Sequence, residues 1–86
     1  MMKLQLRFFA SLREDLGLSE ELVSVPASVV NIAELRAWLM QRGEVWAQLL
    51  SSERSLSCAV NQHIAAENLA LSDGDEVAFF PPVTGG

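Results

Sequence analysis

Residues 3–9 alternate between two faces, and this pattern constrains the fold more than any other part of the chain. Leu4, Leu6 and Phe8 fall on one side, and the polar side chains of the segment fall on the other. A period of two is typical of a half-buried β-strand. The segment therefore predicts a strand that covers a hydrophobic core with one face, so the fold must contain a sheet.

The most extended helical pattern lies in the middle of the chain. Ile32, Leu35 and Leu39 recur at helical spacing, and Asn31 followed by Glu34 matches a helix start. We expect this main helix to end at Gly43. Helices readily end at a glycine because it has no Cβ to oppose a left-handed backbone.

Shorter elements are predicted on both sides of this helix. A capping box that begins at Ser11, with Gly17 as a stop, predicts one or two helical turns, and the apolar spacing in 44–50 predicts a short helix. Ser72-Asp73-Gly74-Asp75 predicts a turn in which Gly74 takes a positive φ. Further strands are predicted over 22–26, 56–61, 64–66 and 76–80.

The resulting order of β, β, α, β, β, β predicts an α+β roll, in which a mixed sheet of about five strands carries one main helix packed across it. A chain of 86 residues, half of them hydrophobic, fits one folded domain. Pro81 and Pro82 cannot extend a ladder and favour an extended chain. We therefore expect a body over 1–82 and a flexible tail over 83–86.

Composition excludes several classes of function. The net charge of −5, with one lysine and five arginines, makes nucleic acid a poor partner. Neither a membrane span nor a signal peptide is expected, because no apolar run approaches about 18 residues and the N-terminus alternates. A single cysteine cannot form an internal disulfide, which favours a reducing compartment such as the cytoplasm.

Side chains suited to catalysis are scarce. Cys58 shares a strand face with apolar residues and is expected to be a buried thiol, whereas His63 is expected in a solvated turn. Asp73 and its acidic neighbours Asp75 and Glu76 are expected to build a turn rather than to hold a cation. Zinc needs about four N or S ligands. We therefore expect no bound metal or cofactor and no self-sufficient enzyme.

The chain ends in Gly85-Gly86, which favours chemistry at the terminal carboxylate. Two residues without a Cβ can enter a channel too narrow for any side chain. An ionised carboxylate, with a pKa of about 3.5, is a poor electrophile. An ATP-using partner could convert it to an acyl-adenylate, which a sulfur nucleophile could then attack. The thiocarboxylate formed in this way would be a good sulfur donor.

Two phenylalanines lie on otherwise polar strand faces near this tail. Phe9 falls on the side of Arg7, and Phe80 falls on the side of Glu76. One interpretation is a bulge or a covering loop that buries one of the rings. The other is a partner-binding surface at the root of the tail, where burying one phenylalanine contributes about 1.5–3 kcal/mol.

The last 16 residues, LSDGDEVAFFPPVTGG, resemble the ending of the molybdopterin synthase small subunits, the sulfur-carrier family often called MoaD. The segments Val60-Asn61-Gln62 and Leu6-Arg7-Phe8-Phe9-Ala10 are also similar to that family. The resemblance implies a ubiquitin-like β-grasp fold. It also implies a sulfur-donor subunit without catalytic side chains of its own.

The resemblance further implies two partners. An adenylyltransferase related to ubiquitin-activating enzymes would use ATP to adenylate Gly86, and a sulfurtransferase system would convert it to a thiocarboxylate. The large synthase subunit, in a heterotetramer, would receive the tail and pass sulfur to cyclic pyranopterin monophosphate. Within the tail, Val83, Thr84 and Gly85 would line the approach. Phe9, Phe80 and Pro81 would bind the partners.

Three alternatives remain open at this point. The sulfur carrier of thiamine synthesis has the same fold and the same Gly-Gly end, although the Phe-Phe-Pro-Pro-Val-Thr approach argues against it. A ubiquitin-like modifier would join the same carboxylate to target lysines. The third alternative is an ordinary β-grasp interaction module whose tail has no function.

Overall fold

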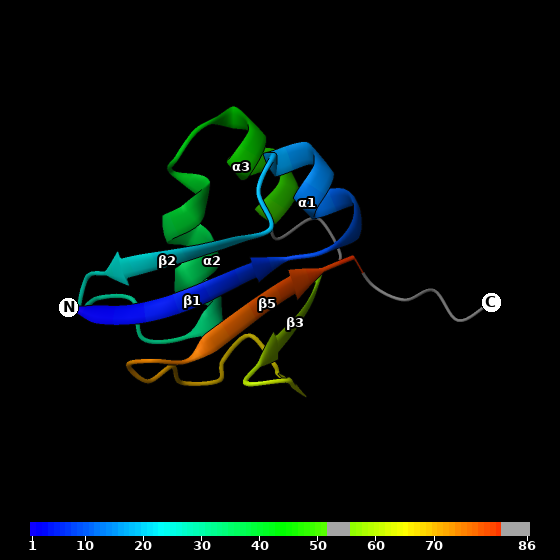
Figure 1. Ribbon diagram of the computed structural model, residues 1–86. Coiled ribbons are helices and arrows are strands. Elements are labelled where there is room, and N and C mark those ends of the chain that lie inside the picture. The colour runs from blue at the N-terminus through cyan, green and yellow to red at the C-terminus, as the bar shows by residue number, and fades with distance from the viewer. Residues whose placement is uncertain (52–55, 82–86) are drawn as a thin grey trace.

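The computed structural model describes residues 1–51 and 56–81. These residues form one mixed sheet with helices on one of its faces (Figure 1). In chain order the elements are β1 (Met2–Phe8), α1 (Ala10–Leu16), β2 (Glu20–Val25), α2 (Ile32–Met40), α3 (Glu44–Leu50), β3 (Ser57–Val60), β4 (His63–Ile64) and β5 (Glu76–Phe80).

The strands are arranged in the order β2-β1-β5-β3-β4. The first and last strands, β1 and β5, are central and parallel, and every other pairing is antiparallel. In Figure 1 both central strands point the same way, so their carboxyl ends lie side by side. The predicted α+β fold with a mixed five-stranded sheet is confirmed.

The alternation in β1 matches the core. Leu4, Leu6 and Phe8 are at most 1% exposed, whereas the two residues between them, Gln5 and Arg7, are half-buried. The inward side of β5 contributes Val77 and Phe79, both fully buried. Fully burying a side chain of this kind stabilises the fold by about 1.5–3 kcal/mol. The central pair therefore anchors the core.

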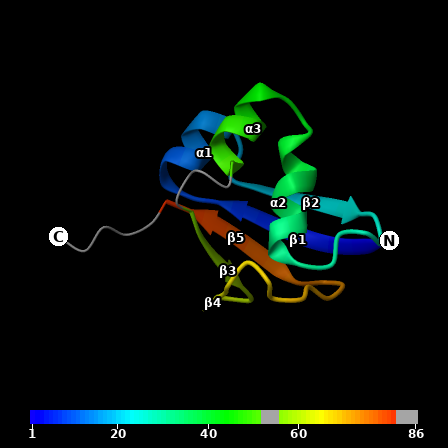
Figure 2. The same cartoon turned by 180° about the vertical axis from the view of Figure 1, so that it is seen from behind.

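Helix α2 covers the inner face of the sheet (Figure 2). Its N-terminus is capped as predicted, since the Asn31 side chain accepts a hydrogen bond from the Glu34 N–H at 2.9 Å. The Glu34 carboxylate in turn accepts from the Val30 N–H at 3.1 Å. The buried side of the helix carries the predicted apolar positions Ile32, Leu35 and Leu39.

Some element boundaries differ from the predictions. The capping box at Ser11 is wrong: α1 begins at Ala10 after Phe9, and no side chain caps it. The Phe9 N–H is held by the Phe79 C=O at 3.2 Å, so the chain turns into the helix directly after the ladder. Gly17 does end this helix, with φ 74°.

Gly43 does not close the main helix, because α2 ends at Met40 and Gly43 instead precedes α3. His63 lies in β4 opposite Val60 rather than in the turn. Two residues, Asn61 and Gln62, suffice for that turn because both adopt positive φ. Such φ values suit a tight hairpin.

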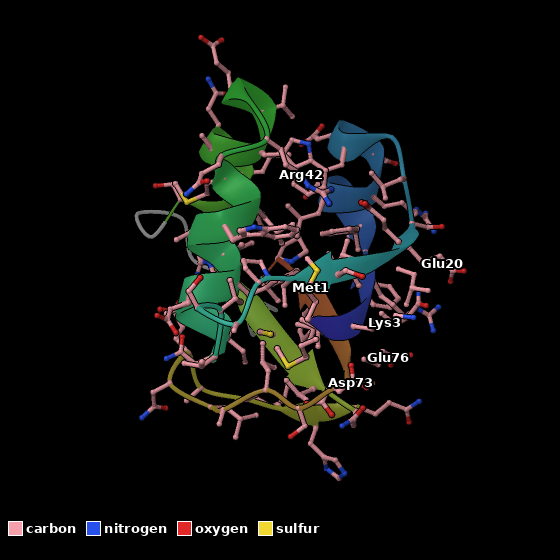
Figure 3. The ribbon with its side chains drawn as sticks, turned by 90° about the vertical axis from the view of Figure 1, so that its left-hand side faces the viewer. Met1, Lys3, Glu20, Arg42, Asp73 and Glu76 are labelled. Atoms are coloured by element: carbon pink, nitrogen blue, oxygen red, sulfur yellow. The ribbon has the colours of Figure 1, made fainter. Side chains whose placement is uncertain are left out.

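The loop after α2 is attached to the sheet edge through Arg42, which is labelled in Figure 3. Its guanidinium pairs with both oxygens of Glu21, in β2, at 2.7 and 2.9 Å. The same group lies 5.6 Å from the Trp38 ring and 4.7 Å from the Trp46 ring. Paired and stacked arginines of this kind fix geometry better than an exposed ion pair alone.

Arg36 of α2 is buried and joins three segments. Its guanidinium donates to the Leu50 C=O at 3.1 Å and to the Ser51 C=O at 2.7 Å, and it pairs with the Glu67 carboxylate. The two carbonyls lie at the C-terminal end of α3, where helix carbonyls lack partners within the helix. Arg36 therefore ties α2 to the end of α3 and to the chain before β5.

We expect Arg36→Met to lower the free energy of unfolding by about 3 kcal/mol, because it leaves carbonyls unpaired in a buried setting. Urea denaturation of the purified chain measures the change. Arg13→Met, on the exposed side of α1, is the matched control and should stay within about 0.5 kcal/mol. Equal stability of the two variants would contradict a structural role for Arg36.

Candidate functional site

The parallel pairing of β1 and β5 brings the two predicted surface phenylalanines to one end of the sheet. Phe8 pairs with Phe79, so Phe9 and Phe80 each follow directly after this pair. The hydrogen bond from the Phe9 N–H to the Phe79 C=O continues the ladder by one step. Phe9 and Phe80 are therefore neighbours across the ladder, at the point from which the tail departs.

These rings are accessible, unlike those of the preceding pair. Phe9 is 39% exposed, and both Phe80 and Pro81 are half-buried. Phe8 and Phe79 are at most 1% exposed and stack in the core with their ring centroids 6.1 Å apart. Complete burial of either surface ring by a bulge or loop is thus wrong. We call Phe9, Phe80 and Pro81 the tail-root patch.

Among the described residues, Arg7 borders the patch on the outer face of β1. The Arg7 guanidinium lies 5.5 Å from the centre of the Phe9 ring, and its Nη1 lies 3.6 Å from an oxygen of Glu76. Both side chains are partly exposed, so this pair contributes little to stability. Among the described residues the Arg7 Nε has no hydrogen-bond partner. A weak ion pair with Glu76 and a ring contact with Phe9 therefore hold Arg7 beside the patch.

The outer face carries two exposed apolar side chains that sequence reasoning had not assigned to a surface. Leu22 in β2 is 67% exposed, and Ile64 in β4 is 77% exposed. Figure 3 shows Lys3, Glu20 and Glu76 on this same side, away from α2. The alternation of residues 22–25 could have identified Leu22 as a surface residue. Val23 and Val25 face inward, so Leu22 must face outward.

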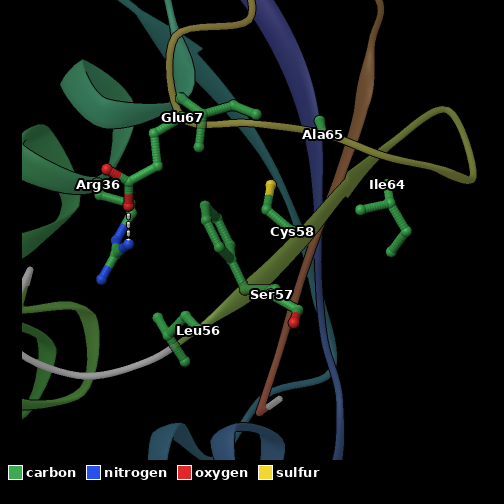
Figure 4. A pocket seen from close by; sticks show the side chains of 9 residues that line it. Arg36, Leu56, Ser57, Cys58, Ile64, Ala65 and Glu67 are labelled. Atoms are coloured by element: carbon green, nitrogen blue, oxygen red, sulfur yellow. Dashed lines mark hydrogen bonds and ion pairs between the residues drawn. The ribbon is translucent and has the colours of Figure 1, made fainter. Parts of the chain in front are cut away.

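Cys58 is confirmed as a buried thiol. It borders a small cavity of about 170 Å³ together with Arg36 and Glu67 (Figure 4). Burial raises the pKa of its thiol from 9.0 to about 12, with Arg36 opposing this shift and Glu67 adding to it. A thiol with so high a pKa is almost never a thiolate at neutral pH. His63, the other candidate nucleophile or base, is exposed at the sheet edge.

The acidic residues near β5 build a turn, as predicted. Asp75 accepts hydrogen bonds from the Ser72 N–H at 2.8 Å and from the Asn61 amide at 2.9 Å. Asp73 accepts from the Lys3 N–H at 2.7 Å, and Gly74 has φ 88°. Within 1–51 and 56–81 no cluster of side chains is suited to a metal ion.

The predicted tail residues Val83, Thr84, Gly85 and Gly86 lie outside the described residues. None of the helices in the described part has the length and apolar character needed to cross a membrane. The tail-root patch is therefore the part of the candidate site that the structure describes.

We expect iodoacetamide to label Cys58 at least about a hundredfold more slowly in the folded chain than in urea at pH 8, because few thiolates form. Mass spectrometry over time measures the rate. Since the folded-state pKa is the higher one, this thiol stabilises the fold fully below about pH 9, and the contribution is lost as the pH rises towards about 12. Equal labelling rates would contradict the buried position.

Comparison with known proteins places the chain in a family. The model described as the ThiS family matches residues 6–86. The chain belongs to the ThiS family. Among its relatives, the molybdopterin synthase sulfur carrier subunit of Escherichia coli (strain K12) is 42% identical over 79 residues, which cover 92% of this chain and 94% of that protein.

Solved structures of similar proteins share the fold of this ThiS-family chain. A chain in the protein-protein complex of subunits 1 and 2 of the molybdopterin-converting factor from Helicobacter pylori 26695 matches with a TM-score of 0.65 and 29% identity, covering 99% of this chain and 100% of that one. SAMP1 from Haloferax volcanii matches with a TM-score of 0.74 and 26% identity, covering 98% and 99%. These matches support the ubiquitin-like β-grasp assignment.

Proposed function

We propose that this chain is the sulfur carrier subunit of molybdopterin synthase and that its reactive group is the carboxylate of Gly86. The single observation that carries this proposal is the position of the tail-root patch. The patch stands where β1 and β5 end together, directly before a segment that finishes in Gly-Gly. The full-length similarity to a carrier subunit supports the same function.

The chemistry takes place at the chain end, and the folded body binds the partner proteins. A carboxylate cannot accept a sulfur nucleophile until one of its oxygens becomes a leaving group. An ATP-dependent adenylyltransferase supplies that step by joining AMP to Gly86 and releasing pyrophosphate. Sulfur then displaces AMP, and the tail carries a thiocarboxylate.

The proposed acceptor of the sulfur is cyclic pyranopterin monophosphate, held by the large synthase subunit. Gly85 and Gly86 enter that subunit's active site, and Val83 with Thr84 lines the approach. The similarity to a chain in a complex of subunits 1 and 2 of a molybdopterin-converting factor supports a large-subunit partner. The carrier binds no cofactor of its own in this scheme, because ATP belongs to the activating enzyme. We expect the assembly in the reducing cytoplasm.

The tail-root patch gives the carrier its affinity for these partners. Threading two glycines into a channel buries little apolar surface, whereas covering Phe9 and Phe80 buries two aromatic rings. Rings at the centre of an interface commonly dominate its energetics. The body therefore binds through the patch, and the tail follows into the active site.

We expect Phe80→Glu to weaken binding to the purified large subunit by at least about tenfold, because a charge replaces an apolar contact. Isothermal titration calorimetry measures the dissociation constant. Val45→Glu is the matched control, since Val45 is an exposed apolar residue of α3, at 50% exposure. An unchanged affinity for the Phe80 variant would remove Phe80 from the interface.

Intact-mass analysis tests the chain-end chemistry directly. After incubation with ATP, the adenylyltransferase and a sulfur donor, we expect the chain to become heavier by the difference between one sulfur and one oxygen atom. Deleting Gly86 should abolish this gain while changing the free energy of unfolding by less than about 0.5 kcal/mol, as for an exposed terminus. A gain that survives the deletion would exclude Gly86 as the reactive residue.

A second candidate function is covalent modification of proteins. The matched SAMP1 from Haloferax volcanii carries the name small archaeal modifier protein 1, which supports this candidate. Both functions use an adenylated terminal glycine, so the products distinguish them. A carrier appears as a free thiocarboxylate, whereas a modifier appears in conjugates of higher mass.

A further inference from the structure

The chain leaves β1 and enters α1 through a sharp change of direction at Ala10. Phe9 is still extended, with φ −124° and ψ 158°, whereas Ala10, the first residue of α1, has φ 54°. The Phe9 C=O accepts a hydrogen bond from the Leu12 N–H at 3.2 Å, which closes a tight turn over Ala10 and Ser11. In Figure 1 this turn lies at the edge where β1 and β5 both end.

A positive φ is unusual for alanine. The Cβ atom opposes a left-handed backbone, so turns that need a positive φ at this position favour glycine, asparagine or aspartate. Asn61 and Gln62 also have positive φ, but they form the two-residue turn between β3 and β4, where such angles are expected. Ala10 instead joins a strand to a helix. Its side chain carries no polar group that could stabilise the conformation locally.

Two contacts enforce this conformation, one on each side of Ala10. Before it, the Phe9 N–H donates to the Phe79 C=O at 3.2 Å, which keeps Phe9 in line with β5. After it, Leu12 inserts into the core and is 1% exposed. With Phe9 in the ladder and Leu12 in the core, the chain has to turn between them. A left-handed Ala10 provides that turn.

The two contacts differ in strength. A fully buried leucine contributes more to stability than one backbone hydrogen bond at the end of a ladder. A residue that resists positive φ at position 10 should therefore release Phe9 before it pulls Leu12 out of the core. The ring of Phe9 is 39% exposed and lies beside the Arg7 guanidinium. The backbone of Ala10 thus decides whether this ring keeps its place.

We propose that Ala10 is a positioning residue for partner docking, and that its left-handed conformation holds the Phe9 ring beside Phe80 in the tail-root patch. The inference rests on the proposed docking function of that patch. Strained backbone persists where the surrounding contacts enforce it, and it gathers at functional sites. Ala10 is itself exposed, so it acts through Phe9 rather than through burial of its own side chain.

The matched variants Ala10→Thr and Ala10→Asn test the positioning in the purified chain. Both side chains are small and polar, but threonine is β-branched and resists positive φ, whereas asparagine tolerates it. The readout is hydrogen exchange of the Phe9 amide relative to the Phe8 amide, which donates to the Ser19 C=O on the other side of β1. We expect Ala10→Thr to raise this ratio at least about tenfold and Ala10→Asn to leave it within about twofold of the wild type.

Binding to the purified large synthase subunit, measured by isothermal titration calorimetry, should follow the same order. We expect Ala10→Thr to raise the dissociation constant at least about fivefold, because the Phe9 ring is no longer held in place, and Ala10→Asn to change it less than about twofold. Ala37→Thr makes the same change as Ala10→Thr on the exposed side of α2. This control for general destabilisation should alter neither the exchange ratio nor the affinity.

Thermal unfolding of Ala10→Gly measures the strain. Glycine takes a positive φ freely, so we expect the melting temperature to rise by about 4 °C. A melting temperature that does not rise would contradict a strained Ala10 and overturn the proposal. If Ala10→Thr does not fold, Ala10→Gln replaces it, because its unbranched side chain resists positive φ less strongly, and the same order of effects is expected.

Equal effects of threonine and asparagine at position 10 would also overturn the proposal, as would faster exchange of the Phe9 amide without a loss of affinity. A wild-type chain that does not bind the large subunit would instead contradict the proposed function. The exchange ratio, which needs no partner, would still decide whether Ala10 positions Phe9.

Discussion

The parallel pairing of β1 and β5 is the constraint on which the rest of the structure depends. It joins residues about 70 positions apart, such as Gln5 and Glu76, at the centre of the sheet. Each central strand offers its other edge to one antiparallel neighbour, β2 or β3. The inward side chains of the pair form the floor on which α2 rests. Loop closure over so long a separation costs entropy, which the buried apolar surface offsets.

The same pairing creates the candidate site. Parallel strands end at the same edge, so the residues after Phe8 and Phe79 come together although they lie in different parts of the sequence. At this edge the rings change from buried to accessible within one residue, because consecutive side chains of a strand point to opposite faces. The tail-root patch thus follows directly from the register of the core.

Three arginines show how the fold uses a guanidinium. Arg36 is buried and satisfies carbonyls at the end of α3, and Arg42 stacks on two tryptophans while pairing with Glu21. Arg7 remains half-exposed beside the patch. Each position uses the planar guanidinium, which has several hydrogen-bond donors and keeps its positive charge.

The alternation of 3–9, the Asn31 cap and the turn at Gly74 were predictable from the sequence because their causes are local. The sequence also showed directly that catalytic side chains are scarce and that the chain ends in Gly-Gly. Together these features suggested chemistry at a chain end. The start of α1 and the position of His63 were not, since a ladder hydrogen bond and a two-residue turn override the local sequence preference there.

Sequence alone therefore determined which segments are strands and helices, which faces are apolar and which residues are available for chemistry. Only the tertiary structure decided that β5 lies beside β1, that Phe9 and Phe80 flank one edge, and that Arg7 rather than Lys3 stands near the tail root. Strand order is decided by packing between segments distant in the chain. No short-range pattern in the sequence carries that information.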